Sequence, residues 1–176
     1  MSTRNADGLR RLAVTGRWGC VVAAAVLVAA TWAHIWTQPI RELVAPLGFV
    51  SLDHVAAWQF ALVRVIACGA TAAAAASLLG LAACFRAMST DDPFPATAAA
   101  LPRFASTVLV ALLVSAVTAP LSSLVLSAGA DPGQGRVVVT LGANHAFALL
   151  ATVAFYALAR LVREAARIER ENAEFV

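Results

Sequence analysis

The chain has 176 residues, of which 61% are hydrophobic and only 13% are charged. Soluble domains are nearer 45–50% apolar and about 25% charged, so this composition excludes an ordinary water-soluble fold. The chain has 13 arginines and no lysine, and with 10 acidic residues its net charge is +3. The arginines are scattered among the ends of the apolar stretches. Direct nucleic-acid binding, which needs a gathered basic patch, is therefore not indicated.

Four apolar stretches, each about as long as a bilayer is thick, dominate the sequence. None contains a side chain that is formally charged at neutral pH. Runs of about 18 or more such residues are typical of transmembrane helices, which satisfy their backbone hydrogen bonds internally. The sequence therefore predicts an all-α, four-helix transmembrane bundle that forms a single integral-membrane domain. The predicted spans are about 19–37, 65–85, 104–126 and 137–159.

The first predicted span follows a basic N-terminal segment, as the apolar region of a cleaved signal peptide also would. A cleavage site would fall at Ala33, where the bulky Trp32 and His34 are its neighbours. The apolar stretch is also long for a signal peptide. We therefore expect this segment to be retained as a span.

The connection 38–59 is the longest between spans. Pro39, with the Ile-Arg-Glu-Leu-Val that follows it, predicts a short turn of helix. Ser51 is a suitable N-cap for the next helix. We expect that helix to run from Leu52 to about Arg86.

Small residues recur at every fourth position of the second span, and this spacing lets helix backbones approach closely in lipid. They form two rows: Gly69, Ala73 and Ser77, and Ala72, Ala76 and Gly80. Packing within the chain is the interpretation that we favour, and the interface of a homo-oligomer is the alternative.

The third span contains Pro120 with hydroxyl side chains around it, which predicts a kink. The fourth span continues without a helix breaker into the C-terminal tail. There Leu161, Ala165 and Ile168 share one helical face, and Arg160 and Glu164 are spaced as an i, i+4 pair. The tail therefore reads as a helical extension of the last span, which either docks a partner or is a solvated helix end.

The distribution of arginine predicts the orientation, because cytoplasmic segments of membrane proteins carry an excess of Lys and Arg. Ten arginines precede the first span, follow the last or lie between the second and third: Arg4, Arg10, Arg11, Arg17, Arg86, Arg103, Arg160, Arg163, Arg167 and Arg170. Only Arg41, Arg64 and Arg136 lie on the other side. Both termini are therefore expected in the cytoplasm, with the protein in a bacterial inner (plasma) membrane.

The fourth span contains the polar pair Asn144 and His145, and polar groups at this depth usually face the interior of the protein. Arg64 lies at a similar level of the second span, so Arg64, Asn144 and His145 form a candidate polar pocket near the outer surface. Three uses stay open: a pH-sensing pocket, since histidine titrates near neutrality, a metal site, and plain hydrogen bonding between helices.

No sequence pattern supports enzymatic chemistry. The motifs of serine hydrolases, of P-loop proteins and of zinc proteases are all missing from the sequence. The three cysteines, Cys20, Cys68 and Cys84, show no CxxC spacing. We therefore expect a non-enzymatic protein without a cofactor or metal.

A cytoplasmic motif follows the second span: Asp91, Asp92, Pro93 and Phe94, and then Arg103. From its residues alone, the motif is either a structural elbow, in which Asp92 caps the next helix, or a docking surface. It resembles the "DPF … LR" loop of a bacterial family of small four-span membrane proteins, domain of unknown function 2975, and the tail 168–176 is similar to the acidic ending of that family. The resemblance implies a membrane-embedded partner of a small helix-turn-helix regulator.

The sequence thus predicts an integral membrane protein, most simply a non-enzymatic partner or regulatory subunit that engages a cytoplasmic protein. Because its apolar spans would lie in the lipid bilayer, the bilayer is a predicted partner. The alternative is a small transporter or channel that uses the outer polar pocket.

Overall fold

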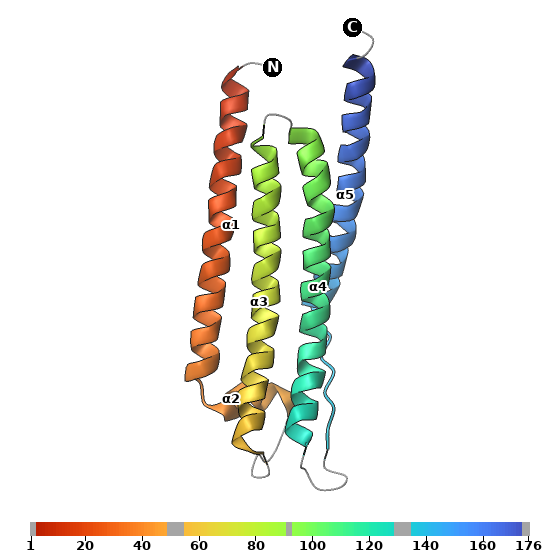
Figure 1. Ribbon diagram of the computed structural model, residues 1–176. Helices are drawn as coiled ribbons and strands as arrows, with labels where there is room; N and C mark the ends of the chain where they lie inside the picture. Colours follow the sequence, from red (N-terminus) through yellow and green to blue (C-terminus); the bar gives the residue numbers. More distant parts are fainter. Residues whose placement is uncertain (1–2, 49–54, 91–92, 129–134, 174–176) are drawn as a thin grey trace.

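The computed structural model describes residues 3–48, 55–90, 93–128 and 135–173 (Figure 1). Every regular element within these ranges is a helix. The elements are α1 (Thr3–Thr37), α2 (Ile40–Val44), the 3-10 helix η1 (Ala45–Leu47), α3 (Ala57–Met88), α4 (Pro93–Ser127) and α5 (Ala143–Ala173).

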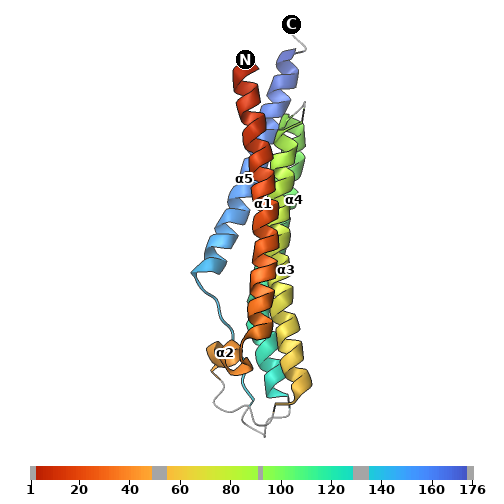
Figure 2. The same ribbon diagram turned by 90° about the vertical axis from the view of Figure 1, so that its left-hand side faces the viewer.

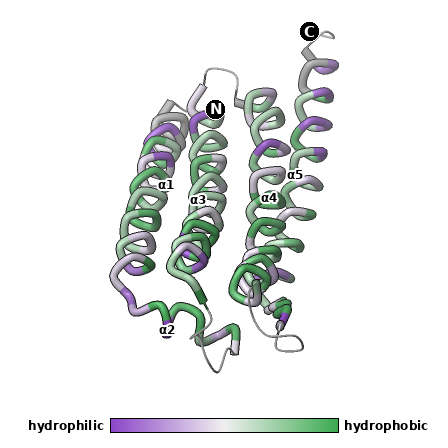
Figure 3. The backbone as a smooth tube through the Cα atoms, turned by 60° about the horizontal axis from the view of Figure 1, so that its bottom comes forward, coloured by the Kyte–Doolittle hydropathy of each residue, from purple (hydrophilic) through white to green (hydrophobic). Residues whose placement is uncertain are grey.

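Four of these helices are long and apolar enough to cross a membrane, over Arg10–Thr37, Ala57–Met88, Phe94–Ser127 and Ala143–Ile168. Most of their large apolar side chains point outward, as the exposed Val26, Val110 and Leu150 illustrate. Apolar residues continue along the length of the helices (Figure 3). Because so much exposed apolar surface is stable in lipid and not in water, the architecture is that of a membrane-spanning protein. The all-α class and the four apolar helices are confirmed.

The four long helices stand in an open row rather than in a closed bundle. α1 packs on α3, α3 on α4, and α4 on α5, and no extensive contact joins α1 to α5 within the described ranges. The first half of α5 leans away from α1 and α3 (Figure 2). The start of α1, the end of α5 and the turn between α3 and α4 lie at one end, which we call the terminal end; α2 marks the opposite, α2 end (Figure 1).

Each end has its own small core. At the terminal end, Cys84, Leu101, Phe104 and Ala159 join α3, α4 and α5, and the rings of Phe104 and Phe155 meet edge to face at 4.7 Å. At the α2 end, the buried cluster consists of Val44, Val63 and Leu126. The short α2 is therefore held by burial, and its position after Pro39 confirms the predicted helical turn.

Glycines permit the close helix contacts of the row. A Cβ on Gly16 would lie 2.9 Å from the ring of Phe85, and a Cβ on Gly80 would lie 2.8 Å from Thr107 Oγ1. Ser77 also donates a hydrogen bond to the Thr107 carbonyl at 3.1 Å. The small residues at 77 and 80 therefore pack within the chain, whereas Gly69 faces open space.

Exposed tryptophans mark two levels along α1. Trp18 and Trp36 lie roughly 27 Å apart at 1.5 Å per residue, which is close to the hydrocarbon thickness of a bilayer, about 30 Å. Each ring has a guanidinium nearby, that of Arg17 at 5.7 Å and that of Arg64 at 5.4 Å. We refer to these heights as the Trp18 level and the Trp36 level.

The structure corrects the predicted start of α3. The helix begins at Ala57 with Ala56 as its N-cap, and residues 55–56 are not helical, so it does not run from Leu52. Ser51, the predicted cap, lies outside the described residues. The capping group is instead Gln59, whose Oε1 accepts a 2.7 Å hydrogen bond from the Ala56 N–H.

The structure also corrects the predicted start of the last span. The helix α5 begins at Ala143, and residues 137–142 are not helical. β-Branched Val137–Thr140 and then Gly142 disfavour helix there. The Val138 N–H donates to Ser123 Oγ at 3.0 Å, which holds this segment against α4.

Candidate functional site

A cavity of about 240 Å³ lies at the α2 end between α2, η1, α3, α4 and the start of α5. One side is apolar, with Leu43 and Val63 among its lining residues. The other side carries hydroxyl groups and one imidazole. These polar lining residues are Ser115, Thr118, Ser122, Thr140 and His145.

His145 ties the first turn of α5 to α4. The ring Nδ1 accepts a 3.2 Å hydrogen bond from the Gly142 N–H, and the backbone N–H of His145 donates to the Gly142 carbonyl at 3.0 Å. Its Nε2 lies 3.4 Å from Ser115 Oγ. Because Nδ1 accepts, the neutral ring carries its proton on Nε2, facing Ser115.

Ser122 adds a further hydroxyl to the lining of the cavity. The residue as a whole is only 4% exposed. Its neighbours are engaged: Thr118 donates to the Val114 carbonyl and Ser123 to the Pro120 carbonyl. Ser122 thus adds one more polar group to the α4 wall of the cavity.

Hydrogen bonds between distant segments fix the walls of this cavity. Gln59, which is 2% exposed, donates from Nε2 to the carbonyls of Val125 and Ala128, both at 2.6 Å. Arg136 Nη1 donates to the Gly48 carbonyl at 3.1 Å. Gly48 has a φ of 71°, a backbone conformation that is strained for residues with a side chain.

The three residues of the predicted pocket do not come together. His145 lines the cavity, but Asn144 is exposed. Arg64 turns toward α1, where Nη2 donates to the Gln38 carbonyl at 3.2 Å while Nε is buried without a partner in the described part of the chain. Ser115 and Thr140, rather than Arg64 and Asn144, line the cavity beside His145. The i, i+3, i+7 spacing of Ser115, Thr118 and Ser122 was the signal for a polar face on α4.

The motif that the sequence predicts to be cytoplasmic is divided in the structure. Asp91 and Asp92 lie outside the described residues. Pro93 is the first residue of α4, and Phe94 follows with an exposed ring. Arg103 lies further along α4, where it lines a cavity of about 280 Å³ between α3 and α4.

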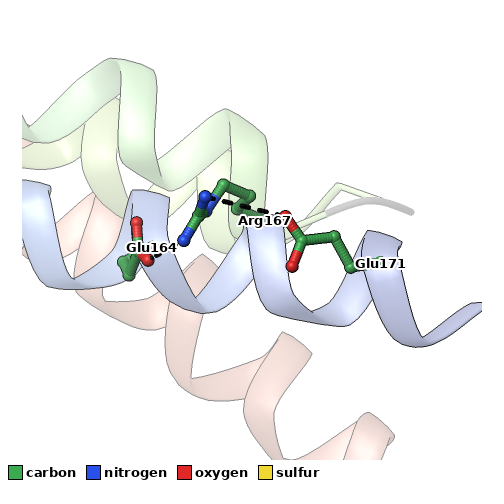
Figure 4. Close-up of polar contacts among 3 residues, drawn as sticks. All are labelled: Glu164, Arg167 and Glu171. Atoms are coloured by element: carbon green, nitrogen blue, oxygen red, sulfur yellow. Dashed lines mark hydrogen bonds and ion pairs between the residues drawn. The ribbon is translucent and has the colours of Figure 1, made fainter.

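A groove of about 540 Å³ separates α4 and α5 at the terminal end. Its lining combines small apolar residues of α4 with charged residues of α5: Pro95, Ala98, Ala99, Pro102, Arg163, Glu164, Ala166 and Arg167. Arg167 pairs with Glu164 and, at 3.7 Å, with Glu171 (Figure 4). Both pairs stay on α5, so they leave the groove open.

In the described ranges, no three His, Cys, Asp or Glu residues are grouped so that they could hold a metal ion. Comparisons with family models, curated proteins and solved structures find no match for the chain. The resemblance to domain of unknown function 2975 therefore stays a prediction from the sequence.

Proposed function

We propose that this chain is a non-enzymatic membrane partner or regulatory subunit that engages a cytoplasmic protein through its terminal end. The groove between α4 and α5 is the observation that carries the proposal. It combines an apolar floor with charged side chains of α5, as protein-binding grooves for helices often do.

The groove lies beyond the Trp18 level. Gly16 packs on Phe85, whose neighbour Cys84 shares a core cluster with Phe104 and Ala159. These residues therefore lie at nearly the same height along the helices, close to the Trp18 level. From Ala159, α5 continues to Ala173, which is roughly 21 Å at 1.5 Å per residue. The groove residues of α5 belong to this extension, which would stand in water beside the membrane.

The charge pattern favours the cytoplasm for this end. Arg10, Arg17, Arg86 and Arg163 all belong to segments at the terminal end, whereas Arg41 belongs to α2. An excess of arginine marks the cytoplasmic side of membrane proteins. We therefore propose a bacterial inner membrane location with both termini in the cytoplasm.

The partner that fits the groove is a helix with small apolar residues and acidic flanks, which would meet the Arg163 side of the groove. The resemblance to domain of unknown function 2975 favours a small helix-turn-helix regulator as the protein that supplies it. Under this proposal the membrane chain would hold the regulator at the bilayer, and the regulator itself would bind nucleic acid.

Site-specific crosslinking tests the proposal. A photoreactive side chain at Pro95, an exposed residue that lines this groove and not the cavity between α3 and α4, should capture one cytoplasmic protein in intact membranes. The same protein should co-purify with the full chain and be lost when residues 163–176 are deleted. Ala99→Trp and Pro95→Trp, which both fill the groove from exposed positions, should each reduce co-purification at least about tenfold, the loss expected when an anchor contact is blocked. Pro95→Trp is needed because Ala99 also lines the cavity between α3 and α4.

Ala74→Trp is the matched control, because Ala74 is an exposed residue of α3 outside the groove. It should leave the co-purifying protein unchanged. Retention of the same proteins by the deletion variant and by Ala99→Trp would refute docking at this groove.

A second candidate function, a small transporter or channel, is favoured by the break at the start of the last span. Ser115, which contacts His145, lies roughly 18 Å from Arg103 along α4 at 1.5 Å per residue. Phe104, the neighbour of Arg103, lies close to the Trp18 level. Ser115 and the first turn of α5, which it contacts, therefore lie inside the bilayer. Non-helical backbone at such depth is stable only inside protein or beside water, and broken spans form the substrate sites of many transporters.

Flux measurements in proteoliposomes test this second candidate. His145→Ala should abolish flux of a transported ion or small solute, because it removes the only imidazole lining the cavity among the described residues. His34→Ala is the control, since His34 lies in the last turn of α1 and does not line the cavity. Equal flux in the wild type, in His145→Ala and in protein-free vesicles would refute it.

A further inference from the structure

The cavity between α3 and α4 at the terminal end contains two arginines from neighbouring helices. Arg86 comes from the last turn of α3 and Arg103 from the first third of α4. Both side chains are exposed, and neither forms an ion pair with a described residue. Two guanidinium groups that have no ion-pair partner among the described residues, beside one hollow, repel each other and attract an anion.

The rest of the cavity is apolar and narrow. Gly80 and Ala83 on α3 and Phe104 on α4 line it, and a Cβ on Gly80 would lie 2.8 Å from Thr107 Oγ1. The cavity therefore extends from the two arginines to Ala83 and Gly80, which lie on the bilayer side of Arg86. A ligand for this site needs an anionic head and an apolar tail.

The height of the arginines identifies that ligand. Phe85, next to Arg86, packs on Gly16, which lies just on the terminal side of Trp18. Exposed tryptophans lie at the level of lipid headgroups, so Arg86 stands at that height. Arg103 directly precedes Phe104, which belongs with Cys84 to one core cluster, and it shares this height.

From the shared cavity, the headgroup height of the two arginines and their lack of an ion pair with any described residue, we infer that Arg86 and Arg103 bind the phosphate of an anionic phospholipid. Its acyl chains would lie along Gly80 and Ala83. Basic pockets between helices at this membrane surface recognise phosphate headgroups in this way. The inference requires only that the helices span a bilayer, and it does not depend on the proposed cytoplasmic partner or on transport.

Lipid retention by the purified full chain tests the inference. In native mass spectrometry, the chain should retain phosphatidylglycerol in preference to phosphatidylcholine, and inorganic phosphate should not displace it. The double variant Arg86→Gln/Arg103→Gln should lower the apparent affinity for phosphatidylglycerol about 10-fold to 30-fold, given the attraction of an anionic surface for each arginine. Ala83→Trp, which keeps both arginines, should also weaken retention by occupying the apolar part.

Arg160→Gln/Arg163→Gln is the matched control, because it removes two exposed charges from α5 at the same end. It should retain phosphatidylglycerol like the wild type, and all variants should show the wild-type circular dichroism and elution volume. Equal retention of the two lipids, or an equal loss in the control and in Arg86→Gln/Arg103→Gln, would overturn the site. Displacement by inorganic phosphate would show that the hollow takes free phosphate and not a lipid.

Discussion

The two ends of this molecule are held together in different ways. At the α2 end, polar side chains join segments that are far apart in sequence: Gln59 reaches Val125 and Ala128, and Arg136 reaches Gly48. At the terminal end, the ion pairs of Arg167 stay within α5. The α2 end is therefore cross-linked mainly by hydrogen bonds. The terminal end depends mainly on apolar packing, although the hydroxyls of Ser106 and Tyr156, 2.8 Å apart, also join α4 to α5 there.

This difference suits the roles proposed for the two ends. Buried hydrogen bonds with both partners in place rigidify a structure, and their loss is costly. The charged side chains at the terminal end, by contrast, are exposed beside open cavities, so they can exchange partners at low cost. A fixed α2 end would preserve the shape of the His145 cavity while the terminal end meets lipid and protein.

The largest expected effect comes from removing the central group of the α2 end. Gln59→Leu would delete three hydrogen bonds and remove the Gln59 donor from the Val125 and Ala128 carbonyls. We expect the free energy of unfolding to fall by about 2–3 kcal/mol. Titration of detergent-solubilised protein with dodecyl sulfate, followed by tryptophan fluorescence, measures this change.

Gln38→Leu is the control for this prediction. Gln38 is also near the α2 end, but it takes part through its backbone carbonyl, which accepts from Arg64. The substitution keeps that carbonyl and should leave the unfolding curve nearly unchanged. If both leucine variants lost the same stability, the special role of Gln59 at the α2 end would be wrong.

A smaller effect is expected from the apolar packing of α3 on α4. Gly80→Leu would force side-chain atoms into the space held by Thr107 and Phe104, because even a Cβ would lie 2.8 Å from Thr107 Oγ1. We expect a loss of about 1–3 kcal/mol, typical of overpacking. The same dodecyl sulfate titration measures it.

Gly69→Leu is matched to this variant, since both glycines lie on α3 and a Cβ on Gly69 would meet nothing within 4 Å. Leucine is a better helix former than glycine, so Gly69→Leu should be neutral or slightly stabilising. An equal loss in the two variants would mean that the face of Gly69 is also packed, as the interface of a homo-oligomer would be.

Composition and periodicity were sufficient to predict the class of the fold. Stretches without charge that match the thickness of a bilayer have few alternatives to a transmembrane helix, and all four were found. The start of α5 at Ala143 was missed for a physical reason. Residues 137–142 are as apolar as a helix would be, and hydropathy does not distinguish an extended apolar run from the first turns of a helix.

The same limit explains the errors at the candidate site. Counting residues along a span gives the height of a side chain but not the direction in which it points. Val63 and Arg64 are neighbours at one height, yet Val63 lines the cavity and Arg64 turns to α1. Ser115 was missed because its contact with His145 depends on where α5 begins, and the sequence placed that start six residues too early.

The smallest expected effect belongs to the terminal end. Glu164→Gln would remove the carboxylate that pairs with Arg167, but both side chains are more than half exposed and Glu171 remains nearby. Exposed ion pairs gain little because water already solvates both charges. We therefore expect no measurable change in the dodecyl sulfate titration, in contrast to Gln59→Leu. A loss as large as that of Gln59→Leu would show that the charges of α5 stabilise the fold, and the terminal end could not then release them to a partner at low cost.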